Sequence, residues 1–221
     1  MTDYLTPDEF DAMEGVGDWR GVSEGVWAFF RSPTFAASAE FVGAIAELPR
    51  MGEPGTGVDI RHDGVTVKLL TMAGDWWGPS RRDVDLARGI SGLARDRGLV
   101  ADPSVVQSLL LVAGGPDTAA ITPFWQAALG YEPRPDSPDE DLIDTHERGP
   151  SFWFEQMREP RGDGGGAIHI AVWVPFEQAE RRVQAALAAG GRLVRDRSPM
   201  WWTLADAAGN EVDIATTKSR G

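Results

Sequence analysis

The second half of the chain repeats one order of segments, and this repeat constrains the fold more than any other feature of the sequence. A strand-like run is followed by a helical run that ends at glycine, and further short strand-like runs come after it. The first copy comprises residues 105–112, 118–129, 142–145 and 151–157, and the second comprises 168–174, 176–189, 192–194, 201–204 and 211–214. Neither copy could bury its sheet face alone, so we expect the two β-α-β-β-β units to pair into one domain.

The first half has the pattern of a separate α+β domain. Thr6-Pro7-Asp8-Glu9 predicts a capped helix start, and Asp63-Gly64 between two β-rich runs predicts a hairpin. Phe35, Phe41, Val42, Ile45 and Leu48 recur at helical spacing, and a last helix starts at Ser80. Glycine at 98 and proline at 103 mark the boundary. We therefore predict an α+β protein with one domain at 1–98, a linker at 99–103 and a second domain at 104–221.

Composition narrows the classes of partner. The formal net charge is −13, which disfavours nucleic acid and anionic membrane surfaces and favours a cationic ligand. No apolar run is long enough to span a bilayer, and the acidic N-terminus lacks the features of a signal peptide, so we expect a cytoplasmic protein. Cysteine is absent and only three histidines are present, namely His62, His146 and His169. Disulfides and thiolate chemistry are thereby excluded.

Residues 5–98 resemble the pterin-4a-carbinolamine dehydratases. The resemblance rests on Leu5-Thr6-Pro7, Trp19, Phe41-Val42, the run Val65–Leu69, Thr71, Asp83, Leu86 and Ala87. It implies an antiparallel sheet with helices packed on one face, an oligomeric state, and dehydration of a 4a-hydroxy-tetrahydropterin.

Both histidine motifs of that family are altered here. The stretch that holds His-His-Pro in the family reads Pro49 to Gly57, with Glu53-Pro54 as its nearest remnant, and Thr-His is replaced by Thr71-Met72. Dehydration needs a proton donor and a base, for which histidine is suited near neutral pH. Glu53 and Asp75 are the candidate replacements. The alternative for Glu53 is a solvated loop charge, and Asp83 is expected to cap its helix rather than to catalyse. We expect pterin dehydratase activity to be absent or very weak.

Residues 104–216 resemble the vicinal oxygen chelate superfamily, which includes glyoxalases, extradiol dioxygenases and bleomycin-resistance proteins. The resemblance rests on Phe124-Trp125, Leu129-Gly130-Tyr131, Ile168-His169-Ile170 and the stretch from Asp206 to Asn210. It implies a cleft enclosed by paired sheets and a divalent metal on Gln107, His169 and Asp213, with Glu155 as a further ligand. Without a metal, His169 would be a hydrogen-bonded interior residue and Asp213 a polar group of the cleft.

Four tryptophans fall on strands that would line this cleft: Trp153, Trp173, Trp201 and Trp202. Indole rings around an acidic cleft suit a flat or cationic ligand, although core or interface packing explains them as well. Three functions follow. One is a lyase-like or glyoxalase-superfamily enzyme on a cyclic substrate, with His169 as a catalytic group. The second is a binding protein of the drug-resistance type, and the third is a homo-oligomeric regulatory protein.

Overall fold

The computed structural model describes residues 3–49, 51–74, 76–147, 149–157, 168–205 and 211–218. The chain divides into two compact units, Met1–Val106 and Gln107–Gly221. The predicted linker at 99–103 is wrong in detail. Val100–Ala101 forms strand β7, which pairs with β2 (Gly25–Arg31), and Pro103–Val105 forms a 3-10 helix, η1. The boundary therefore lies after Val106. Within the described residues, no helix is long and apolar enough to cross a membrane.

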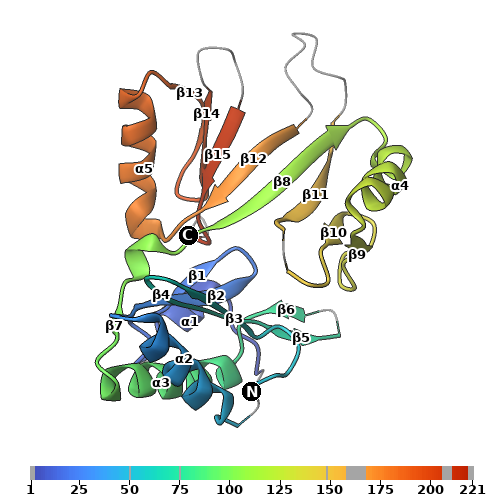
Figure 1. Ribbon diagram of the computed structural model, residues 1–221. Helices are drawn as coiled ribbons and strands as arrows, with labels where there is room; N and C mark the ends of the chain where they lie inside the picture. The colour runs from blue at the N-terminus through green and yellow to red at the C-terminus, as the bar shows by residue number, and fades with distance from the viewer. Residues whose placement is uncertain are drawn as a thin grey trace. The chain divides into compact units, whose positions relative to one another are not determined.

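The first unit combines helices with an antiparallel sheet, so its α+β class is confirmed (Figure 1). The sheet has the order β1-β2-β4-β3, with β7 beside β2. Its strands are β1 (Arg20–Val22), β2 (Gly25–Arg31), β3 (Gly57–Arg61) and β4 (Gly64–Leu69). The helices are α1 (Pro7–Asp11), α2 (Phe35–Ala46) and α3 (Arg81–Asp96), and β5 (Thr71–Ala73) pairs with β6 (Trp76–Gly78) as a separate hairpin.

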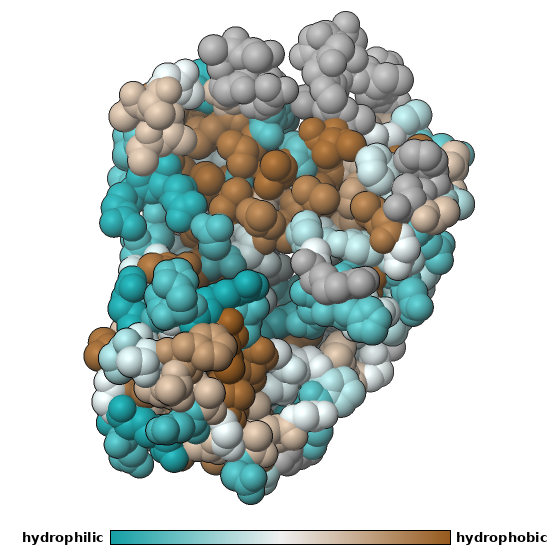
Figure 2. Space-filling model, viewed as in Figure 1, coloured by the Kyte–Doolittle hydropathy of each residue, from teal (hydrophilic) through white to brown (hydrophobic). Residues whose placement is uncertain are grey.

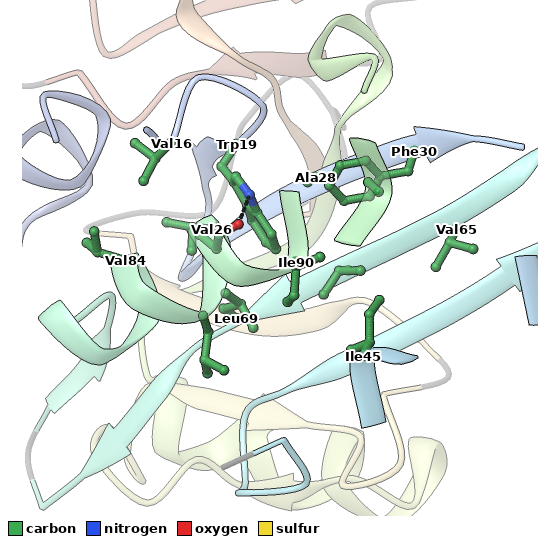
Figure 3. Packing of buried hydrophobic residues seen from close by; sticks show 14 of the residues in the cluster. Val16, Trp19, Val26, Ala28, Phe30, Ile45, Val65, Leu69, Val84 and Ile90 are labelled. Atoms are coloured by element: carbon green, nitrogen blue, oxygen red, sulfur yellow. Dashed lines mark hydrogen bonds between the residues drawn. The ribbon is translucent and has the colours of Figure 1, made fainter. Parts of the chain in front are cut away.

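One buried core joins α2 and α3 to the sheet of the first unit. Figure 3 shows apolar side chains of β2 and β4 facing those of the helices, among them Phe30, Ile45 and Ile90. The indole of Trp19 is buried at the centre of this core, and its Nε1 donates to the carbonyl oxygen of Ala87 at 3.2 Å and to Oγ of Ser91 at 3.1 Å. The polar N–H of this large buried side chain therefore has hydrogen-bond acceptors inside the core.

The second unit has the predicted repeat of β-α-β-β-β. Its eight-stranded sheet has the order β13-β14-β15-β12-β8-β11-β10-β9. The first copy comprises β8 (Ser108–Gly115), α4 (Thr118–Leu129), β9 (Glu132–Pro133), β10 (Asp141–Ile143) and β11 (Ser151–Gln156). The second comprises β12 (Ile168–Trp173), α5 (Phe176–Ala188), β13 (Arg192–Arg197), β14 (Trp201–Ala205) and β15 (Glu211–Ala215). The first strands of the two copies, β8 and β12, pair antiparallel and join the copies into one sheet.

Both helices of the second unit pack on the same face of this sheet. Phe152 and Phe154 pack with α4, whereas Leu204 and Ile214 pack with α5. Exposed hydrophobic residues lie on this face as well, namely Leu109, Ile168, Ile170 and Leu193. Figure 2 shows hydrophobic side chains gathered over the strands between α5 and α4. The opposite face is named the tryptophan face here, and it carries Val112, Trp153, His169, Ala171, Trp173, Trp201, Thr203 and Asp213.

Candidate functional site

The strand register brings chemically active side chains together on the tryptophan face. Residues that are direct partners on neighbouring strands project to the same side of a sheet. Ala171 on β12 is the partner of Asp213 on β15, and Asp213 is the partner of Thr203 on β14. In the neighbouring row, Trp173 and Trp201 are both partners of Ala215. The predicted residues Trp173, Trp201 and Asp213 therefore share one face, and Thr203 lies among them.

His169 and Asp213 form a close, partly buried histidine–carboxylate pair on this face. Nε2 of His169 lies 3.4 Å from Oδ2 of Asp213, and the two side chains are only 20% and 16% exposed. The interaction with Asp213 raises the pKa of His169, burial opposes it, and the charges of Asp213, Glu155 and Glu211 raise that pKa further. The imidazole is therefore biased toward the protonated form beside a carboxylate.

Three buried polar atoms of the tryptophan face have no hydrogen-bond partner among the described residues. They are Nε1 of Trp173, Oγ1 of Thr203 and Oδ1 of Asp213. A buried polar group without a partner costs about 1–3 kcal/mol, and such groups are rare in folded proteins. One donor, one hydroxyl and one acceptor left unpaired on adjacent strands are typical of a site that is completed by a bound molecule or by ordered water.

The predicted metal site is wrong, because Gln107 does not reach the other two residues. Gln107 lies before β8, and its Oε1 accepts a hydrogen bond from Nη1 of Arg182 at 3.3 Å. The β8 partner of His169 is Val112, five residues further on, which is about 17 Å along a strand. Among the described residues, no group of three histidine, cysteine or carboxylate side chains could hold a metal. Gln107, His169 and Asp213 therefore do not come together as the predicted three-residue metal site.

The four predicted tryptophans divide between the two faces. Trp153, Trp173 and Trp201 lie on the tryptophan face, because Trp153 is the partner of Val112, which in turn is the partner of His169. Trp202 projects to the other side and packs against the hydrophobic cluster of α5, so it does not share a face with the other three. Successive residues of a strand point to opposite faces, so only one of two adjacent tryptophans can line a site.

The first unit joins the two stretches that carry the altered histidine motifs through one arginine. Nη1 of Arg82 donates to Oε2 of Glu53, and Nη2 of Arg82 donates to Oγ1 of Thr71 at 2.9 Å. Thr71 in turn donates to Oδ2 of the buried Asp83 at 2.7 Å, and the backbone N–H of Ser80 donates to the same oxygen at 2.8 Å. Glu53 is thus ion-paired rather than a free loop charge. Asp75, the other predicted catalytic residue here, lies outside the described residues.

Comparison with known proteins identifies both halves. Two curated proteins of Mycobacterium leprae, from strains Br4923 and TN, carry the provisional name pterin-4-alpha-carbinolamine dehydratase. Each is 30% identical to this chain over 93 residues, which cover 42% of this chain and 97% of the relative. The chain belongs to the pterin-4-alpha-carbinolamine dehydratase family. In addition, residues 111–215 match the model of a family described as glyoxalase-like domain.

Two solved structures each cover half of this dehydratase-family chain. One is described as an NAD-dependent benzaldehyde dehydrogenase from Legionella pneumophila, with 13% identity and a TM-score of 0.37 over 99% of its own length. The other is a glyoxalase/bleomycin resistance protein/dioxygenase superfamily member from Vibrio splendidus 12B01, with 19% identity and a TM-score of 0.33 over 99% of its length.

Membership in the dehydratase family makes the changed residues of the first unit informative. The positions that resemble the two histidine motifs hold Glu53 and Thr71-Met72, and Arg82 joins Glu53 to Thr71. A guanidinium stays protonated near neutral pH, so it can donate hydrogen bonds but cannot exchange protons as histidine does.

Sequence reasoning missed two residues of these sites. Arg82 gives no sequence signal, because it is one of two adjacent arginines at the start of a helix. Thr203 could have been found from the period of two, since it follows Trp201 by two residues on the same strand.

Proposed function

We propose that the tryptophan face of the glyoxalase-like unit binds a flat small molecule, and that the His169–Asp213 pair acts on it without a metal. The glyoxalase-like match and the dehydratase relatives support a small-molecule-processing protein. One observation supports a ligand site on this face. The unpaired Nε1 of Trp173, Oγ1 of Thr203 and Oδ1 of Asp213 lie on the face that also carries the rings of Trp153 and Trp201. Indole rings provide flat contact area, and the unpaired atoms would fix the orientation of the ligand.

His169 is the proposed proton-transfer group for a lyase-type or dehydration step. Asp213 orients its Nε2, which leaves Nδ1 as the nitrogen that could give a proton to a leaving oxygen or take one from carbon. Asp213 would then stabilise the protonated ring, which is present before His169 gives a proton or after it takes one. In this proposal the dehydratase-family unit takes no part in the chemistry, because the stretches that hold histidine in the family hold Glu53 and Met72 in this chain.

A conservative pair of variants tests the binding site. Trp173→Phe removes the indole N–H, and Thr203→Val removes the hydroxyl while keeping the shape. Because Thr203→Val removes an unpaired buried hydroxyl at constant shape, we expect the free protein to keep or gain stability, whereas in Trp173→Phe the lost ring contacts offset this gain. Ligands found by a thermal-shift screen of flat aromatic compounds should bind about tenfold more weakly to either variant.

Trp202→Phe is the matched control, since it changes an indole on the opposite face. It should lower the stability of the free protein and leave ligand affinity unchanged. If Trp173→Phe and Thr203→Val destabilise the protein but bind every ligand as tightly as the parent, the unpaired atoms are structural and the proposed site is wrong.

The second candidate function is ligand binding without catalysis. It is favoured because His169 is the only histidine among the described residues of this face, so no second histidine could act as acid or base. His169→Ala separates the two. An enzyme should lose turnover and keep most of its ligand affinity, whereas a binding protein has no turnover to lose. The expected homo-oligomer and the regulatory role stay predictions.

A further inference from the structure

Edge strand β13 carries three arginines on the tryptophan face. Arg192 is the partner of Ala205, Arg195 of Thr203, and Arg197 of Trp201. A register irregularity between Leu193 and Arg195 keeps all three on the side of the indoles. Direct partners on antiparallel strands point the same way, so these guanidinium groups border the proposed ligand site.

This concentration of positive charge is unusual for the chain. The protein has 21 lysines and arginines against 34 aspartates and glutamates, yet three arginines share one six-residue strand. Their side chains are exposed, and among the described residues none of the three guanidinium groups has a hydrogen bond or an ion pair. Charges on an edge strand also prevent unwanted strand pairing. That role, however, does not require the three charges to share one face.

The arginines continue the two rows of site residues. One row runs from Ala171 through Asp213 and Thr203 to Arg195, and the other runs from Trp173 through Ala215 and Trp201 to Arg197. Neighbouring strands are about 4.8 Å apart, so the backbone of Arg195 lies two spacings, about 10 Å, from that of Asp213. A small ring compound spans such a distance. The overall acidity favours cations, but these local side chains favour an anion at this edge.

We propose that the ligand carries an oxyanion, a carboxylate or a phosphate, which Arg195 and Arg197 bind while its ring lies against Trp201 and Trp173. This inference rests on the proposed ligand site. Guanidinium groups bind oxyanions through paired hydrogen bonds, and arginine also stacks on rings. Thr203 lies between Arg195 and Asp213 in the same row, and its hydroxyl is buried without a partner among the described residues.

Titration of the full chain with three naphthalene probes of matched shape tests the inference by calorimetry. The probes are 2-naphthoate, 2-naphthyl phosphate and the neutral 2-naphthamide. We expect at least one anion to bind more tightly than the amide. In the double variant R195Q/R197Q, affinity for that anion should fall about tenfold or more, while affinity for the amide stays unchanged. The preferred anion distinguishes a carboxylate ligand from a phosphate ligand.

Arg181→Gln is the charge control, because Arg181 is an exposed residue of α5, the helix on the opposite face. It should leave all three affinities unchanged. If the amide binds as tightly as both anions, and W201F weakens all three probes, the ligand site stands and the oxyanion inference is wrong. If no probe binds at millimolar concentration and the thermal-shift screen also finds no ligand that Trp173→Phe weakens, the proposed function and this inference both fail.

Discussion

At the scale of single residues, the His169–Asp213 pair makes stability depend on pH. The pKa of His169 is raised above the ordinary histidine value of 6.5, chiefly by its hydrogen bond to Asp213, with Glu155 and Glu211 adding to the effect. A raised pKa in the folded state means that this contribution is fully present below the unfolded pKa and is lost as pH rises through the folded pKa. The folded protein should therefore lose stability as pH increases from below 6.5 to above the raised value.

Asp213→Asn tests this dependence, since it keeps the shape and removes the main cause of the raised pKa. Urea unfolding at a series of pH values should show a decline through this window in the parent and a flatter profile in the variant. His169→Gln should flatten the same window. Parallel profiles in the parent and both variants would show that the pair does not contribute.

Residue pairings were the least predictable part of the site. The sequence predicts a strand at 105–112, in which Gln107 would face the cleft. In the structure, Asp102 accepts from the backbone N–H of Ser104 and residues 103–105 turn as η1, so β8 starts only at Ser108. The side chain of Trp202 was likewise misplaced. A period of two predicts that adjacent tryptophans separate, but the sequence does not indicate which one faces the helices.

At the scale of elements, three segments of the first unit decide whether dehydration can occur. The loop with Glu53, the start of β5 at Thr71 and the start of α3 at Arg82 meet in one hydrogen-bonded network. The network holds no histidine among its described members. General acid–base groups typically contribute about 10²–10⁴-fold to a rate, so their loss should be severe. We expect turnover of a 4a-carbinolamine tetrahydropterin to be indistinguishable from the uncatalysed rate.

A spectrophotometric dehydration assay checks this expectation, with a family member that keeps both histidine motifs as the positive control. The double variant E53H/M72H provides a second measurement, since it returns histidine to both altered positions. Any rate gained only in that variant would assign the loss to these positions. Turnover by the parent protein at the rate of the control would contradict the prediction.

Most elements could be predicted from the sequence because their signals are local. The capping box at Thr6 and Glu9 is present, and the helix at 118–129 and its glycine end are found where predicted. The hairpin around Asp63-Gly64 also forms, as β3 paired with β4. The network around Arg82 could not be predicted, because it joins three segments that are distant in the sequence and none has a periodic pattern.

At the scale of the whole molecule, each unit has its own buried core and its own sheets. The first core joins α2 and α3 to β2 and β4. In the second unit, every strand of the eight-stranded sheet lies between Ser108 and Ala215, and its two hydrophobic clusters are formed within residues 111–214. A segment with a closed set of strand pairs and its own core can in principle fold alone.

We therefore expect the fragment 107–221 to fold cooperatively without the dehydratase-family unit. Urea unfolding followed by circular dichroism should give a single transition, with a slope lower than that of a larger fold because less surface is exposed. The shorter fragment 107–167 is the control. It contains one β-α-β-β-β copy, which would leave the β12 side of β8 unpaired and its face uncovered, so it should not fold. The prediction is wrong if 107–221 is unfolded alone and folds only when residues 1–106 are attached. The stability of the glyoxalase-like unit would then depend on the rest of the chain, and the site on its tryptophan face should be studied in the intact protein.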